Sequence, residues 1–162
     1  MAFDTITVTP TLDTSAYSDN DVLFVSTAVK LPHRNCKVTA IDAVIADTAG
    51  ANTDSILFFF KEDTNELGTI NATADITGAQ MAANVLLGTV RLVSSGETSL
   101  GTPTLLKGQH INDIDAVISG MDNIVLTEGS TKNTCYIQAL YEGGAAGTYA
   151  ADALVITISV EY

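Results

Sequence analysis

The last ten residues, ALVITISVEY, carry the pattern that most restricts what this chain can fold into. A side-chain repeat of two residues is the geometry of a β-strand, in which successive side chains point to opposite faces. The segment 153–162 therefore predicts a half-buried antiparallel strand. Its core face is expected to carry Leu154, Ile156, Ile158 and Val160.

Other segments of the chain also have the length and composition of strands. They are bounded by Pro, Gly, Asn or Asp and lie at 5–9, 21–29, 35–47, 55–61, 86–93, 123–127 and 134–141. The glycines of EGGAAG predict that 134–141 and 153–162 form a hairpin with a longer loop. The polar stretch 94–122 is expected to be an excursion with at most one short strand.

The stretch ITGAQMAANVL predicts the one short helix, capped by Thr77 and running from Ala79 to Val85. About eight strands and one helix in 162 residues predict a single all-β domain over 1–162. The expected fold is an antiparallel β-sandwich of the jelly-roll type, which is the eight-stranded form of this architecture. Residues 1–21 are expected to form an extended N-terminal lead-in to it.

The charge of the chain excludes several classes of partner. Nineteen acids stand against seven Lys plus Arg, for a net charge of −12. Nucleic acids and anionic membranes both require a basic surface, so neither is an expected partner. The basic residues Lys30, His33, Arg34 and Lys37 nevertheless fall within eight positions. They form either a solvated basic turn or a docking patch for an acidic partner.

The two cysteines, Cys36 and Cys135, belong to no metal-binding motif. Both occur in strand-like sequence, where they are either two buried thiols or a disulfide. The N-terminus MAFDTITVTP has no secretory-signal pattern. The strongest apolar run, Ile56–Phe60, is much shorter than a membrane span. The protein is therefore expected to be made and kept in a soluble form.

Residues suited to catalysis or metal binding are scarce and scattered. His110 lies near Asp113 and Asp115, which is one conceivable ligand trio, but a solvated acidic loop explains the same residues. Two histidines cannot supply the ligand set of a cupin-like jelly-roll enzyme. Nucleophile elbows, phosphate loops and dinucleotide-binding fingerprints are missing. We therefore expect no enzyme, no catalytic residues, no cofactor and no metal.

The segment TPTLDTSAYSDNDVLF, residues 9–24, mixes acids, hydroxyls and a tyrosine, as a ligand loop would. Asp19 and Asp21 lack the remaining ligand spacing of a calcium loop and are interpreted as turn formers that bond nearby backbone amides. We expect a turn over Asp13 to Ser15 and a packed, anchoring Tyr17. Asn20 tolerates the left-handed conformation that a second turn requires.

This segment resembles the opening of a family of small bacteriophage virion proteins, written P-T-L-D-T-S-A-Y-x-x-G-D-V-L, with Asn20 in place of the glycine. Four further pieces match in the same order, so that the resemblance covers most of the chain apart from 94–122. They are CKVTAIDAVIADTAG, SILFFFKEDT, ITGAQMAANVLLGTV and CYIQALYEGGAAGTYAADALVITISVEY.

The resemblance implies a jelly-roll protein on the outer surface of a phage head, made in the host cytoplasm. It implies a decoration or cement role, with a homotrimer bound across junctions between subunits of the major capsid protein. Lys30, His33, Arg34 and Lys37 are then the expected contacts with the capsid. Two alternatives remain open: a tail or fibre protein of the same sandwich fold, and a carbohydrate-binding or receptor-binding module.

Overall fold

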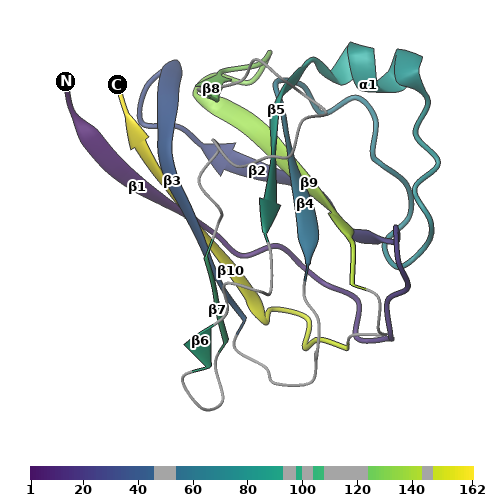
Figure 1. Ribbon diagram of the computed structural model, residues 1–162. Helices are drawn as coiled ribbons and strands as arrows, with labels where there is room; N and C mark the ends of the chain where they lie inside the picture. The colour runs from purple at the N-terminus through teal and green to yellow at the C-terminus, as the bar shows by residue number, and fades with distance from the viewer. Residues whose placement is uncertain (46–53, 93–97, 100–103, 108–123, 144–147) are drawn as a thin grey trace.

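The computed structural model describes residues 1–45, 54–92, 98–99, 104–107, 124–143 and 148–162. Within these residues the chain forms ten strands and one helix (Figure 1). The strands are β1 (Phe3–Val8), β2 (Val22–Lys30), β3 (Asn35–Ile45), β4 (Ser55–Phe60), β5 (Leu86–Leu92), β6 (Thr98–Ser99), β7 (Thr104–Lys107), β8 (Val125–Thr127), β9 (Thr134–Tyr141) and β10 (Leu154–Glu161). The helix is α1 (Gly78–Asn84).

The strands form two antiparallel sheets. The first sheet has the order β1-β10-β3-β7-β6, with β8 also paired to β3, and the second has the order β2-β9-β4-β5. Strands β1 to β5 and β8 to β10 are the eight strands that the sequence predicted, and in this order they form a jelly roll. The predicted all-β sandwich with one short helix is confirmed.

Strands β6 and β7 correct the prediction for 94–122, which allowed at most one short strand. They pair with each other, and β7 pairs with Asp42–Ile45 of β3. The other end of β3, Asn35–Lys37, pairs with β8. The 11-residue β3 thus offers a longer ladder than β8 can occupy, and β7 takes backbone groups at its other end.

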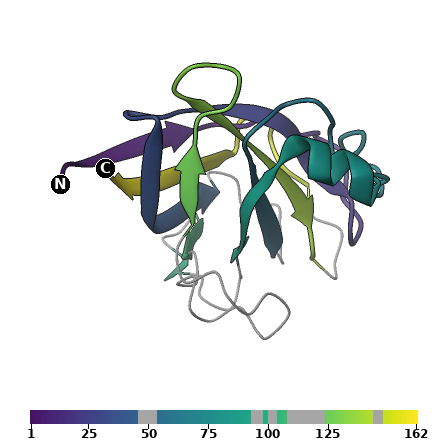
Figure 2. The ribbon, with the colours of Figure 1, turned by 90° about the horizontal axis from the view of Figure 1, so that it is seen from above.

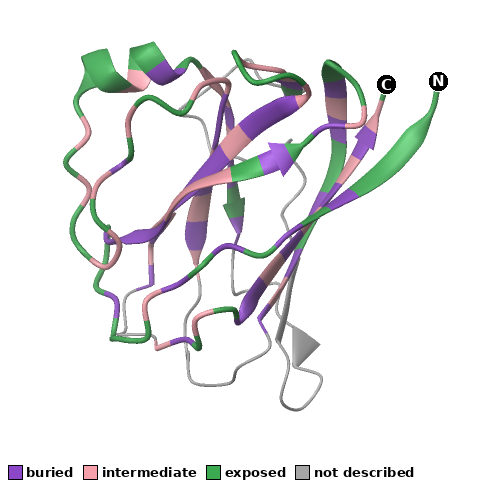
Figure 3. Ribbon diagram, turned by 180° about the vertical axis from the view of Figure 1, so that it is seen from behind, coloured by how far each residue is buried: buried purple, intermediate pink, exposed green. Residues whose placement is uncertain are grey.

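The alternation in β10 becomes a strict change between buried and half-buried side chains along the strand (Figure 3). Its apolar face packs into the core between the two sheets, and its neighbours are β1 on one edge and β3 on the other. Each large apolar side chain that is fully buried in this way contributes roughly 1.5–3 kcal/mol. The core face of β10 was therefore predictable from the sequence alone.

The predicted hairpin between 134–141 and 153–162 is wrong, because β9 and β10 lie in different sheets. Strand β9 already has β2 on one edge and β4 on the other. Strand β10 is likewise enclosed by β1 and β3. With both edges of each strand occupied, the connection crosses from one sheet to the other instead of turning back on itself.

Helix α1 covers the outer face of the second sheet, on the side of the sandwich away from both termini (Figure 2). A second apolar cluster lies beneath it, built on Val22, Phe60 and Leu67, with Met81 of the helix packed against them. The predicted cap is confirmed: the Thr77 hydroxyl accepts the Gln80 N–H, and the Gln80 side chain accepts the Thr77 N–H.

A buried amide network, which the sequence did not reveal, fixes the loop before α1. Asn84 is fully buried, and its Oδ1 accepts the Thr64 hydroxyl at 2.7 Å and the Asn65 N–H at 2.9 Å. Gln138 of β9 is also fully buried, and its Oε1 accepts the Leu67 N–H at 2.7 Å. These side chains satisfy backbone groups that the apolar cluster would otherwise leave without partners.

The lead-in contains β1 and two turns. Asp13 Oδ1 accepts the Ser15 N–H at 2.6 Å, which forms the first expected turn and lowers the pKa of Asp13. Asp21 Oδ2 accepts the Ser18 N–H at 2.7 Å, and Asn20 has a φ of 68°, as expected. Asp19 differs from its prediction, because it accepts a hydrogen bond from the side-chain amide of Asn20 and not from a backbone amide.

Both cysteines are buried free thiols, which confirms the first of the two alternatives. Burial raises the pKa of the Cys135 thiol to about 12, with a smaller contribution from Cys36. A thiol in the unfolded chain ionises near its ordinary pKa of 9.0. Between these two values the folded state keeps a proton that the unfolded state releases, so stability falls as the pH rises.

We expect this difference at Cys135 to lower the free energy of unfolding by about 2 kcal/mol between pH 8 and pH 10.5. Below pH 9 the contribution is fully present. Urea denaturation across this range, compared with the Cys135→Ala variant, measures it. The variant should lose this part of the pH dependence, and an equal fall in both proteins would contradict the assignment.

Candidate docking surface

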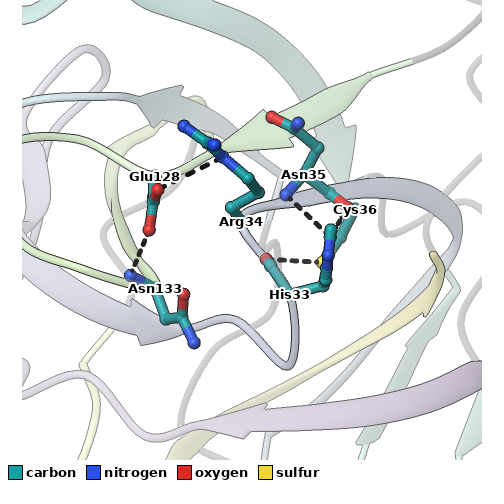
Figure 4. Close-up of polar contacts among 6 residues, drawn as sticks. All are labelled: His33, Arg34, Asn35, Cys36, Glu128 and Asn133. Atoms are coloured by element: carbon teal, nitrogen blue, oxygen red, sulfur yellow. Dashed lines mark hydrogen bonds and ion pairs between the residues drawn. The ribbon is translucent and has the colours of Figure 1, made fainter.

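The four basic residues predicted as contacts lie at one end of the sandwich, around the turn that joins β2 to β3. Leu31 anchors this turn: its side chain is buried, and its N–H donates to the Asn133 carbonyl at 2.9 Å. The turn is thereby joined to residues 128–133, which connect β8 to β9. His33 and Arg34 project from it (Figure 4). We call Lys30, His33, Arg34 and Lys37 the basic end.

Arg34 is largely exposed, with 68% of its side chain accessible. Its Nε lies 3.4 Å from Glu128 Oε1, and the Glu128 N–H donates to the Arg34 carbonyl at 2.9 Å. Glu128 also accepts the Asn133 N–H at 2.8 Å, which orients the carboxylate (Figure 4). One edge of the guanidinium is held, and the rest of it faces solvent.

His33 contacts the C-terminus of the chain. Its ring stacks on Tyr162, with 6.0 Å between the centroids and 8° between the planes. The Cys36 thiol donates to the His33 carbonyl at 3.2 Å, which holds the backbone of the turn against β3 (Figure 4). The His33 ring and the Tyr162 ring therefore form one continuous part of this surface.

Lys37 and Lys30 diverge from the turn in two directions. Lys37 points from the outer face of the first sheet, where its Nζ lies 3.4 Å from Glu161 Oε1 of β10. Lys30 ends β2 and donates to the Thr134 hydroxyl at 2.9 Å. The structure thus gathers Lys30, His33 and Arg34 around the end of the sandwich, while Lys37 lies next to them on the outer face of the first sheet.

The sequence did not reveal the other residues that shape this end. Lys132 lies in the turn that is bonded to Leu31, so that four of the chain's seven Lys and Arg residues belong to this region. An open hollow of about 500 Å³ adjoins Lys37 and is lined also by Met1, Val125 and Tyr162, whose side chains are exposed. Cationic and apolar groups therefore meet at one end of an acidic protein.

Within the part of the chain that the structure describes, no three His, Cys, Asp or Glu side chains come together to hold a metal ion. The trio His110, Asp113 and Asp115 lies outside the described residues. None of the described helices is long and apolar enough to cross a membrane.

The arrangement at the basic end suits contact with another macromolecule, because exposed and partly neutralised cations lie there beside apolar side chains.

Comparisons with known proteins add little to this picture. No family profile matches the chain, and no curated protein matches its sequence. Among solved structures it is similar to a chain from Desmodium yellow mottle tymovirus, with 11% identity and a TM-score of 0.29. That match covers 98% of this chain and 85% of the other. A TM-score this low supports no inference about function.

Proposed function

We propose that this chain is a structural protein of a bacteriophage virion. In this proposal it decorates the outside of the head as a homotrimer and stabilises contacts between subunits of the major capsid protein. The support is the sequence resemblance, which extends over most of the chain, together with the jelly-roll fold that the resemblance implied. The proposal gives the protein no catalytic role.

The observation that carries the docking part of the proposal is the composition of the basic end. A chain with a net charge of −12 places four of its seven Lys and Arg residues there, beside the exposed side chains of Met1, Val125 and Tyr162. Complementary charge steers two surfaces together, and exposed apolar groups gain free energy once water is excluded. We propose that this end meets an acidic surface of the capsid.

Reversing two charges of the basic end tests the proposal. The Arg34→Glu/Lys37→Glu variant should bind at least about tenfold more weakly to phage heads prepared without this protein, because attraction becomes repulsion. Lys30 is left unchanged in the first variant, since its bond to Thr134 ties β2 to β9. Adding Lys30→Glu should weaken binding further. Occupancy is measured by cosedimentation with the heads and by electron microscopy of the particles.

The matched control is Ala72→Glu/Ala79→Glu/Ala82→Glu/Ala83→Glu, which makes the same change of −4 at exposed positions of α1 and of the loop before it, on the side of the sandwich away from both termini (Figure 2). It should bind as the wild type does. Equal loss in both variants would show a general charge effect and reject the basic end as the contact. Wild-type protein that does not bind heads, or that is found on tails, would overturn the decoration role itself.

A further inference from the structure

The two sheets differ in what covers their outer faces. The outer face of the second sheet lies under α1 and the loop before it, where the apolar cluster of Val22, Phe60 and Leu67 is buried. On the first sheet, Thr5, Thr39, Ala40 and Asp42 are exposed. We call the outward-facing side chains of β1, β10 and β3 the open face. Figure 3 colours the exposed parts of β1 and β3 green.

The open face carries few charges for a chain with 19 acids and seven bases. Its middle row runs across the three strands from Thr5 through Ser159 to Ala40, as the register shows. The row nearer the termini runs from Phe3 through Glu161 to Lys37, where the two charges form an ion pair. The row on the other side of the middle row runs from Thr7 through Thr157 to Asp42, which is exposed.

The open face also has a projecting ring and a hollow. Phe3 is 68% exposed at its edge, beside a hollow of about 450 Å³ that is lined also by Thr5, Thr39 and Ser159. The hollow lies where the register between β10 and β3 shifts at Ser159 and Val160, which leaves Thr39 as an extra residue in β3. A protruding ring and a recess on one face are features that packed interfaces use.

We propose that the open face is where copies of this chain associate. This inference rests on the part of the proposed function in which copies form an oligomer. Two molecules that each carry a charge of −12 repel wherever acids face each other. On the open face Lys37 and Glu161 are paired within each copy, and Asp42 adds one further carboxylate, so two copies meet little of this repulsion there. A cationic partner would be attracted to the more acidic surfaces instead and would gain little from this face.

The free edge of β1 is a less suitable contact between copies. Ala2 and Tyr162 exchange both backbone hydrogen bonds, so the pairs alternate and the N–H groups of Phe3, Thr5 and Thr7 point away from β10. The Thr5 N–H already donates to Asp4 Oδ1 at 2.8 Å. An occupied donor and a carboxylate at this edge oppose edge-to-edge pairing with a second acidic copy. Association therefore uses the face and not the edge.

The Thr5→Glu/Ala40→Glu variant tests the proposal by placing two carboxylates in the middle row. Both positions are exposed. Sedimentation equilibrium and light scattering should show an oligomer for the wild type and a monomer for the variant at the same concentration. The matched control, Ala79→Glu/Ala83→Glu on α1, adds the same charge and should remain oligomeric. Circular dichroism and urea denaturation show whether the variant is folded.

A wild-type protein that stays monomeric at high concentration, or a folded variant that stays oligomeric, would overturn the inference. If the variant unfolds, Thr7→Glu on the edge strand β1 replaces it, and it too should shift the mass toward the monomer. Binding of wild-type protein to phage heads is measured separately. If the proposed function is wrong, the wild-type protein does not bind heads in that assay. If the open face is not the contact between copies, the mass of the free protein shows it.

Discussion

Replacing Tyr17 with alanine should lower the free energy of unfolding by about 3–5 kcal/mol, the loss expected for a fully buried aromatic ring. Tyr17 has no exposed surface, and its ring lies 5.9 Å from that of Tyr141 and 5.7 Å from that of Tyr149. These three rings join the lead-in to β9 and to the segment before β10. Urea denaturation followed by circular dichroism measures the change.

Tyr17→Phe separates the hydroxyl from the ring. The Tyr17 hydroxyl accepts the Asp13 N–H at 2.6 Å and donates to the Leu23 carbonyl at 3.1 Å. Its removal leaves two backbone groups without this partner, so we expect a loss of about 1–3 kcal/mol. Tyr136→Phe is the control, because its hydroxyl makes only an exposed 3.3 Å contact with Thr131. Its effect should stay within about 0.5 kcal/mol.

If Tyr17→Ala and Tyr136→Phe had equal effects, Tyr17 would not be the anchor that its contacts indicate. The result also bears on the resemblance to phage virion proteins, since Tyr17 belongs to the segment that carries it. A large loss of stability would mean that this segment resembles those proteins because it is needed to fold the subunit. Two of the three acids of the same segment, Asp13 and Asp21, bond backbone amides in turns.

Gly129→Ala should destabilise the protein by about 2–3 kcal/mol, because the new methyl group has no space. A Cβ at this position would overlap the Lys61 carbonyl oxygen, which is backbone and cannot move aside as a flexible side chain does. The Gly129 N–H donates to the Thr134 carbonyl at 2.9 Å, and Glu62 accepts the neighbouring Ser130 N–H. The substitution therefore strains the 128–133 turn beside the basic end.

Gly78→Ala is the matched control for Gly129→Ala. Gly78 begins α1, and a Cβ there meets nothing within 4 Å. Alanine at a helical position should be neutral or stabilise by up to about 1 kcal/mol. Thermal and urea denaturation of both variants measure the contrast. Similar stabilities for the two would show that the close approach of Gly129 to Lys61 does not restrict this turn.

Local features of the sequence predicted most of the fold. The eight jelly-roll strands and the capped helix follow from side-chain periodicity and turn residues, which depend on neighbours along the chain. The hairpin assigned to β9 and β10 was wrong for the same reason: glycines in a connection do not reveal that both strands have partners elsewhere. The pairing of β7 with the end of β3 was likewise hidden, because it joins distant segments.

The candidate docking surface was also predicted only in part from the sequence. The run of Lys30, His33, Arg34 and Lys37 is visible in the sequence, and its placement at a turn follows from the flanking strands. Lys132 is about a hundred residues away along the chain, and only tertiary contacts, such as the Leu31–Asn133 and Arg34–Glu128 backbone hydrogen bonds, show that its turn lies beside that run. The neutralising partners Glu128 and Glu161 are also far from Arg34 and Lys37 in the sequence.

The sequence by itself determined which side chains share a face of each strand, where the chain turns and where the helix begins. Only the tertiary structure decided which strands are neighbours, which sheet lies beneath α1 and which keeps the open face. The physical reason is that periodicity and capping are set within a few residues, whereas pairing and burial depend on contacts between segments far apart in the chain.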